Sequence, residues 1–335
     1  EISVLLSVMA NESTWVYYTV DTQKGYAAIC IFINILVLVS NALAVLTFHK
    51  MGKLQIQHYL MLGLVGSDMC ILVQNTIIVV FLLMGNVWIS ETLCFALGSA
   101  SVSAATITSL VHSAMALDRW ISINHALAYS KFQDSAKSRK AIICMLCVIY
   151  VLPCSTLLLT WQFGQISFYF DTYVSYCIAD VGTKGFWGLL VAAIFSIAIP
   201  GITQSFTNIS ILITIAKLSS VDRAQLIRSV KTVLTTLGVY YICWTPMGIW
   251  TVLDFVTEAS TPGWYGFFAV QMVVLNSMTC FFIYYKTMRR FRDGFTRMIH
   301  TSNISAVFNM HSRGTVSMHP SAISTTMGGE EEDKV

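Results

Sequence analysis

The sequence predicts an all-α membrane protein, a bundle of seven transmembrane helices followed by a short cytoplasmic amphipathic helix. Of the 335 residues, 56% are hydrophobic and only 11% are charged, whereas a soluble domain carries about 25% charged residues. Seven apolar runs are each long enough to cross a bilayer, which takes about 20 residues. The Lys and Arg residues gather in alternate connections between these runs. Such a chain lacks the polar surface of a nucleic-acid-binding protein or a cytosolic enzyme.

The apolar runs define the predicted helices in chain order. They are Gly25–Phe48, Tyr59–Met84, Cys94–Leu117, Ala141–Trp161, Phe186–Ala216, Thr232–Leu253 and Gly263–Tyr285. Runs of this length predict helices, because barrel strands need only about 10 residues and alternate in polarity. The expected division of the chain is an extracellular N-terminus at 1–24, a membrane domain at 25–285, an amphipathic helix at 286–298 and a disordered cytoplasmic tail at 299–335.

The basic residues indicate the direction of the chain. Lys24 and Lys184 are the only Lys or Arg residues in the N-terminus and the second, fourth and sixth connections, whereas the other 18 of 20 lie in the remaining connections and the tail. Because cytoplasmic segments carry the excess of positive charge, we expect a multi-pass protein with its N-terminus outside the cell. The basic inner loops favour contact with anionic membrane lipids or with an acidic protein face.

Two features fall on the predicted outer side. Seven of the nine Cys residues lie inside the apolar runs, whereas Cys94 opens the third run at its outer end and Cys177 stands in the fourth connection, so that only these two are placed at the outer face. Because that compartment is oxidising, we predict a disulfide between them, against the alternative of two unpaired thiols. Asn11, followed by Glu and Ser, is a predicted glycosylation site.

Asp68 is the only charged residue inside the seven runs, which makes it a functional candidate. Polar residues on other helices are placed to supply oxygens beside it, namely Asn41, Thr108, Asn276 and Ser277. Carboxylate, hydroxyl and amide oxygens suit a hard cation such as sodium. A protonated Asp68 that hydrogen-bonds between helices explains the same residues, and the polarity of the site does not choose between the two.

Two motifs mark the third and sixth runs. The sequence Asp-Arg-Trp at 118–120 closes the third run at its cytoplasmic end, where neighbouring opposite charges can neutralise each other. The sequence Cys-Trp-Thr-Pro at 243–246 lies inside the sixth, where Pro246 removes a helix hydrogen bond and bends the helix. The bulky Trp244 next to this bend can couple binding above it to the position of the lower half. Pro200 predicts a further bend in the fifth run.

In their order along the chain, these residues resemble the class A, or rhodopsin-like, G-protein-coupled receptors over about residues 25–295. Each motif alone is weak, but the ordered set on the expected helices is specific. The matching residues are Asn41, Asp68, Cys94, Asp118, Arg119, Trp120, Pro200, Trp244, Pro246, Asn276, Ser277 and Tyr284. The resemblance implies a plasma-membrane receptor that is not an enzyme and has no cofactor beyond a sodium ion at Asp68.

The resemblance also implies how such a receptor signals. The sixth helix would swing outward below Pro246, Arg119 would leave Asp118 to meet a heterotrimeric G protein, and Tyr284 would stabilise the opened cleft. Ser and Thr residues of the tail, once phosphorylated, would recruit arrestin-type partners, because added negative charge creates sites for basic surfaces.

The chain departs from the family at several switch positions. Cys280 and Phe281 replace the usual Asn-Pro of the seventh helix. Ser109 and Tyr240 stand where Ile and Phe are usual, and His112 replaces an apolar residue. These departures keep open a receptor-like membrane scaffold that does not signal. A transporter is less favoured, because the chain has no repeated halves.

The resemblance places a ligand pocket toward the outer ends of the third, fifth, sixth and seventh helices. The residues at the expected positions are Ser101, Val102, Ala192, Ser196, Met247, Thr251, Val270 and Val274. A receptor for amines would have an acid at Ser101, and an opsin would have a Lys at Val274 for its Schiff base. A neutral pocket instead favours a lipid-like or weakly polar ligand, or a peptide held by the outer loops. The aromatic fourth connection, which includes Phe170 and Tyr176, favours a packed lid slightly over peptide contacts.

Overall fold

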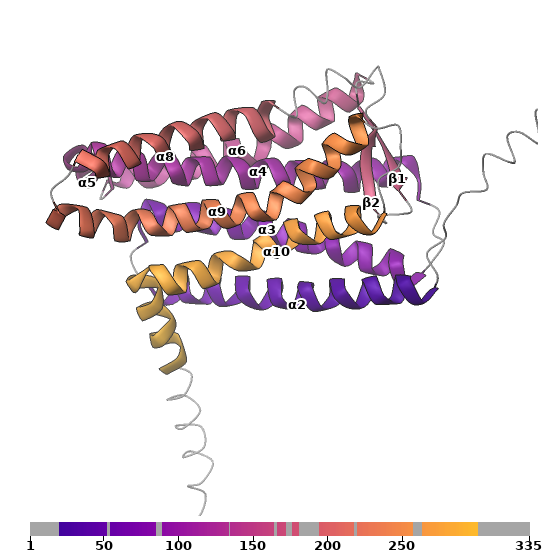
Figure 1. The fold of residues 1–335 in the computed structure, drawn as a ribbon, viewed down its shortest axis with the longest axis horizontal. Helices are drawn as coiled ribbons and strands as arrows, with labels where there is room; N and C mark the ends of the chain where they lie inside the picture. The colour runs from indigo at the N-terminus through magenta and orange to yellow at the C-terminus, as the bar shows by residue number, and fades with distance from the viewer. Residues whose placement is uncertain are drawn as a thin grey trace, which may run out of the picture.

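The computed structural model describes residues 20–51, 54–84, 89–133, 135–163, 166–171, 176–180, 194–217, 220–256 and 263–300. Seven long helices lie side by side and form a bundle (Figure 1). They are α2 (Val20–Lys50), α3 (Ile56–Met84), α4 (Glu91–Asn124), α6 (Ala136–Gln162), α8 (Ile199–Lys217), α9 (Ser220–Val256) and α10 (Gly263–Thr287). Within the described ranges, six are long and apolar enough to cross a membrane, and α9, whose first turns carry charged residues, completes the seven. The predicted fold class is confirmed.

The polarity of the bundle is inverted relative to that of a soluble protein. Large apolar side chains face outward, as with Phe32 at 64% exposure and Ile202 at 71%, whereas Asp68 and Gln204 are each 1% exposed. Soluble proteins rarely expose apolar patches of more than roughly 600 Å². Such an exterior fits hydrocarbon as the surrounding solvent, in which the backbone polar groups must be satisfied within helices.

A two-stranded antiparallel hairpin closes the end of the bundle at which α2 and α10 begin (Figure 1). Its strands are β1 (Ser167–Asp171) and β2 (Tyr176–Asp180). A disulfide joins Cys177 of β2 to Cys94 in the first turn of α4, with the two Cα atoms 5.4 Å apart. The predicted disulfide is confirmed, and the aromatic connection forms a lid over this end.

The aromatic residues of β1 seat the hairpin on α4. Phe168 packs so closely on Gly98 that a Cβ at this glycine would lie 2.1 Å from the Phe168 ring. Phe95, one helical turn before Gly98, has its ring 5.8 Å from Phe168 and stacks on Trp161 of α6 at 4.3 Å. Only a glycine permits this approach, so the sequence of α4 is matched to the hairpin.

Helix α4 is the centre of the bundle, since it contacts α3, α6, α8, α9 and both strands of the hairpin. Its buried face carries small hydroxyl residues, including Ser103, Thr106, Ser109 and Ser113. Small side chains let neighbouring helices approach closely. The hydroxyl groups of Thr106 and Ser113 donate to the carbonyl groups four residues earlier, at 2.8 and 2.9 Å. A polar sequence can therefore line a helix that is buried among many neighbouring elements.

Three prolines interrupt the helices. Pro153 lies inside α6 and Pro246 inside α9. Pro200 is the second residue of α8, which directly follows a π-helical stretch at Ile194–Ala198. Because a π-helical turn disturbs the regular backbone ladder, the irregularity predicted at Pro200 takes this form.

Two short helices flank the opposite end of the bundle. Helix α5 (Ala126–Gln133) connects α4 to α6, and a further helix at 289–300 follows α10. Phe291 of this last helix is fully buried, with its ring 5.3 Å from that of Phe48 and 5.7 Å from that of Phe281. The amphipathic helix expected at 286–298 begins at 289 instead, because α10 continues to Thr287. The N-terminus with Asn11 and the tail after 300 lie outside the described residues.

Candidate functional site

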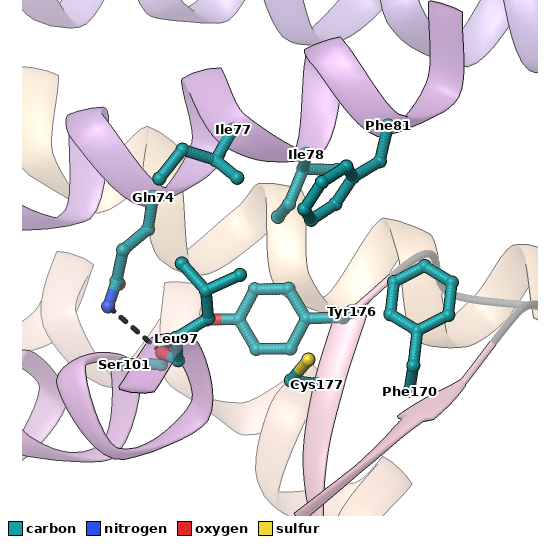
Figure 2. A pocket seen from close by; sticks show the side chains of 9 residues that line it. All are labelled: Gln74, Ile77, Ile78, Phe81, Leu97, Ser101, Phe170, Tyr176 and Cys177. Carbon is teal, nitrogen blue, oxygen red and sulfur yellow. Dashed lines mark hydrogen bonds between the residues drawn. The ribbon is translucent and has the colours of Figure 1, made fainter. Parts of the chain in front are cut away.

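A small pocket lies beneath the hairpin, between α3, α4 and β2 (Figure 2). Its empty space is about 260 Å³, part of it open to solvent. It is lined by Gln74, Ile77, Ile78, Phe81, Leu97, Ser101, Phe170, Tyr176 and Cys177, none of which is charged. Only about 10 Å³ of it is room for the centre of a water-sized molecule, whereas ligand pockets usually measure about 300–1,000 Å³, because the side chain of Tyr176 extends into it.

The polar groups of the pocket converge on Ser101. Its hydroxyl donates to the carbonyl of Leu97 at 2.9 Å, and the amide of Gln74 donates to the same carbonyl at 3.3 Å. The hydroxyl of Tyr176 in turn donates to Ser101 Oγ. The floor of the pocket is therefore a chain of neutral hydrogen bonds that runs from the hairpin into α4.

Asp68 lies buried in the interior, and both of its carboxylate oxygens lack a hydrogen-bond partner among the described residues. The hydroxyl of Ser277 from α10 lies next to this carboxyl group and is likewise buried without a partner in that part of the chain. Asn41 donates to the backbone carbonyl of Ser277 at 3.0 Å, Thr108 donates to the serine before Asp68 at 3.1 Å, and Asn276 is buried. Orphaned carboxylate and hydroxyl oxygens fit a hard cation such as sodium.

A hydrogen-bonded cluster joins α4, α8 and α9 within the bundle. The hydroxyl groups of Ser109 and Tyr240 lie 2.5 Å apart. The amide of Gln204 donates to Ser113 at 3.1 Å and accepts a hydrogen bond from Tyr241 at 3.1 Å. Gln204 on α8 thus connects two neighbouring helices through one buried side chain, which holds α4, α8 and α9 in one relative arrangement.

Aromatic rings connect this cluster to the bend in α9. The ring of Tyr240 lies 5.5 Å from that of Trp244 and 4.8 Å from that of His112. Two residues beyond Trp244, the carbonyl of Pro246 accepts a hydrogen bond from Tyr265 of α10 at 3.3 Å. A displacement of the outer half of α9 can therefore reach the cluster through rings in direct contact.

At the opposite end of the bundle, Asp118 Oδ1 accepts a hydrogen bond from Tyr129 of α5 at 2.7 Å. Burial, reinforced by the adjacent carboxyl group, raises the pKa of Tyr129, so its phenol stays protonated and keeps donating. Arg119 Nη2 is buried with no hydrogen-bond partner among the described residues. Asp118 therefore has a hydrogen-bond donor on α5, in addition to the charge of the neighbouring Arg119 that the sequence indicated.

Two further predicted switch residues lie near Arg119. Trp120 donates from its indole nitrogen to Ser210 of α8 at 2.8 Å. Tyr284 is 2% exposed, and its hydroxyl lies 4.0 Å from the sulfur of Met115. Both side chains therefore occupy the interfaces that α4 forms with its neighbours at this end.

The sequence matches the family described as 7 transmembrane receptor (rhodopsin family) over residues 14–284. This chain belongs to the rhodopsin family of receptors. Its fold is similar to the crystal structure of squid rhodopsin, with a TM-score of 0.70, 12% sequence identity, and coverage of 92% of this chain and 90% of that chain. At this identity the likeness concerns the fold alone. A search of curated proteins finds no match.

In this rhodopsin-family receptor, the residues that the sequence places in the ligand pocket lie in different parts of the bundle. Among those described, only Ser101 lines the pocket beneath the hairpin. Met247 and Val270 belong to an apolar cluster that packs against Tyr176, and Val274 packs deeper, with residues of α2, α3 and α4. Ala192 and the side chain of Ser196 lie outside the described residues.

Two other candidates face away from this pocket. Val102 lines a separate crevice between α4, α6 and the π-helical stretch. Thr251 is exposed, and its hydroxyl donates to the carbonyl of Met247 at 2.9 Å. In the described part of the chain, the pocket beneath the hairpin and the expected ligand-binding set share Ser101, and the role of that set in ligand binding stays a prediction.

Some residues of the pocket on α3, and one residue of the hydrogen-bonded cluster on α8, are not among those expected from the sequence. Ile77, Ile78 and Phe81 line the pocket together with Gln74, and their spacing of three and four residues places them on one helical face. That spacing, counted from Gln74, could have indicated them. Gln204 interrupts the apolar fifth run with an amide, which is the signal that marks a buried polar contact in a membrane helix.

Proposed function

We propose that this receptor passes an extracellular ligand signal to a heterotrimeric G protein at the plasma membrane. The hydrogen bond between Ser109 and Tyr240 carries the proposal, because it joins α4 to the half of α9 that lies below Pro246. A contact at this place keeps the inner half of α9 against the bundle. Its loss is the step that ligand binding has to favour.

The proposed movement is an outward swing of the inner half of α9. Displacement of Trp244 shifts the ring of Tyr240, which leaves Ser109 and releases α9 from α4. Arg119 then meets the inserted helix of the G protein, and Tyr284 stabilises the opened cleft. A ligand that prefers the open state by about 1.4 kcal/mol raises the ratio of open to closed receptors tenfold, which a few contacts can supply.

The orientation of the chain supports an extracellular ligand site. The disulfide lies at the hairpin end, and disulfides persist in oxidising compartments. The basic residues of α9 and of the helix at 289–300 lie at the other end, as expected for the cytoplasmic side. Epitope tags on the two ends of the chain test this orientation. Tags that report the same compartment would contradict it.

The chemistry of the pocket supports a neutral ligand. Its lining residues carry no charge, so a lipid-like or weakly polar molecule fits better than an ammonium ion. A peptide that contacts the hairpin is the second candidate, because Tyr169 of β1 is 47% exposed. We also propose a sodium ion held by Asp68 and Ser277, and arrestin-type partners for the phosphorylated tail.

Arg119→Ala tests the coupling step in a G-protein dissociation assay. The assay is run in cells against a panel of G proteins, first without ligand and then with neutral lipids, peptides and amines. We expect Arg119→Ala to lose most of the wild-type signal at normal surface expression. Arg139→Ala, at an exposed position on α6, is the matched control and should keep it.

The same assay separates a receptor from a scaffold. Full signalling by Arg119→Ala contradicts the proposed role of this residue. Silence of the wild-type chain against every G protein and every ligand of the screen favours the scaffold that does not signal.

A further inference from the structure

Tyr176 is held over the pocket by the residue that follows it. Cys177 is bonded to Cys94, and Ser101 lies seven residues further along α4. Seven residues make two helical turns, so Ser101 lies on the face of α4 that carries Cys94, about 10 Å deeper. The disulfide therefore fixes the hairpin at the height from which the tyrosine side chain reaches Ser101 (Figure 2).

The ring of Tyr176 fills space between helices that a ligand would otherwise enter. It packs against two apolar clusters, which consist of Ala27, Cys30, Ile78, Val79, Leu82 and Phe267, and of Trp250, Ala269 and Val270. The residue as a whole is half-buried, but burial of its phenol end raises the pKa of Tyr176 to about 12. At neutral pH the group in the pocket is thus an uncharged hydrogen-bond donor.

The pocket floor selects for such a donor. Ser101 gives its only hydroxyl proton to the carbonyl of Leu97, and the amide of Gln74 donates to that carbonyl as well. What Ser101 still offers to an occupant is a lone pair, which accepts a hydrogen bond. An occupant needs an O–H or N–H group at this depth, and the uncharged, apolar walls around it suit an aromatic ring.

We infer that the outer pocket is a binding site for a neutral phenol and that the chain's own Tyr176 is its resident occupant. Because Tyr176 is tethered, its effective concentration at Ser101 is high. A diffusible ligand must displace it, which lowers the apparent affinity by the fraction of receptors with an open pocket. That displacement of Tyr176 changes signalling rests on the proposed function. That Tyr176 occupies the pocket can be measured without a G protein.

A small phenol can replace the missing side chain in a truncated variant. The test uses the purified full-length receptor with its disulfide intact and measures thermal unfolding with 4-methylphenol or with toluene, which lacks the hydroxyl group. We expect Tyr176→Ala to unfold at a lower temperature than wild type, and 4-methylphenol to restore stability in a saturable manner and more effectively than toluene. The wild-type receptor should not respond, since its pocket is filled.

The hydroxyl contact has a separate test that keeps the ring in place. Tyr176→Phe and Ser101→Ala each remove one partner, and we expect each to lower the unfolding temperature by about 2 °C. Combined, they should cost less than the sum of the two shifts, because both remove the same hydrogen bond. Tyr169→Ala, at an exposed position on the paired strand, is the control for the hairpin and should not create a response to 4-methylphenol.

Three results overturn the inference. The first is an equal response of wild type and Tyr176→Ala to 4-methylphenol, the second is the lack of a saturable response of Tyr176→Ala, and the third comes from the second test. If Tyr176→Ala does not fold, the decision passes to the second test, where additive shifts of Tyr176→Phe and Ser101→Ala exclude the contact. Neither measurement involves a G protein, so failure here and failure of the Arg119 experiment are distinguishable.

Discussion

Tyr129 donates a hydrogen bond to Asp118 across 2.7 Å and so ties the short helix α5 to the inner end of α4. The bond occupies the carboxyl oxygen that faces α5, while Asp118 Oδ2 and Arg119 Nη2 are buried without hydrogen-bond partners in the described part of the chain. Asp118 is thereby held by α5, and Arg119 keeps a hydrogen-bond donor that another partner can use.

Removal of this hydrogen bond should destabilise the receptor. We expect Tyr129→Phe to lower the free energy of unfolding by about 1–2 kcal/mol, because the buried carboxyl group loses its donor. Thermal unfolding of the purified receptor measures the change. Ser130→Ala removes a hydroxyl group from an exposed neighbour and is the control. Equal effects of the two variants would show that the Asp118 contact contributes nothing.

The same tyrosine predicts a loss of stability at alkaline pH. Burial raises the pKa of Tyr129 above its ordinary value of about 10, so the unfolded chain releases this proton first. The contribution of Tyr129 is fully present below about pH 10 and is lost as the pH rises above it. We expect the unfolding temperature of wild type to fall more steeply above that pH than that of Tyr129→Phe. Parallel curves would argue against a raised pKa.

Gln204 should be a determinant of helix packing. Gln204→Met keeps most of the side-chain volume but removes the bonds to Ser113 and Tyr241, and we expect the free energy of unfolding to fall by about 1–2 kcal/mol. Ser205→Ala, one residue further and exposed, should change stability little. A Gln204→Met receptor as stable as Ser205→Ala would mean that the cluster does not hold α8 in place.

Loss of the Tyr240 hydroxyl should raise signalling in the absence of ligand. If its bond to Ser109 contributes about 1 kcal/mol to the closed state, Tyr240→Phe shifts the ratio of open to closed receptors about fivefold. Basal G-protein dissociation at matched surface expression measures the shift. Tyr241→Phe breaks the bond to Gln204 instead and tests whether the effect is specific. Unchanged or lower basal activity of Tyr240→Phe would argue against this bond as the latch.

Sodium should stabilise the receptor through Asp68. We expect the wild-type unfolding temperature to be higher in sodium chloride than in potassium chloride at equal ionic strength, because a ligand that binds only the folded state stabilises it. Asp68→Asn removes the carboxylate charge and should abolish the difference. If wild type itself does not distinguish the two salts, the cation is absent and a protonated Asp68 between helices explains the site.

The sequence predicts the helices of the bundle well, because whether a segment spans a membrane depends on that segment alone. Length and apolar composition decide whether a segment crosses a membrane, and runs such as Gly263–Tyr285 and the observed α10 differ by only a few residues. The disulfide is equally predictable, since Cys94 and Cys177 are the two cysteines that the sequence pattern places at the outer face. The bounds of a helix are therefore predictable where they depend on its own composition and on the bilayer around it.

The pocket is predicted less well because it depends on contacts between distant segments. How deeply Tyr176 reaches is decided by the pairing of β1 with β2 and by the position in which the disulfide holds this pair on α4, and both depend on segments that are far apart in the chain. Val102 and Val274 face other neighbours because small differences in helix rotation change which side chain lines a cavity. The partners of Gln204 likewise come from two helices far away in the chain.

The close seat of Phe168 on Gly98 has a mechanical consequence for access from outside. The hairpin is anchored to α4 by this contact and by a covalent bond, so it must travel with α4 as one rigid piece. Tyr176 of the hairpin also packs beside Trp250 and Val270, on α9 and α10, and Phe170 packs on Phe81 of α3, both through non-covalent contacts. A route from outside to the interior should therefore open where the hairpin is held by non-covalent contacts, on the sides of the second, sixth and seventh membrane crossings, while the side of the third crossing stays closed.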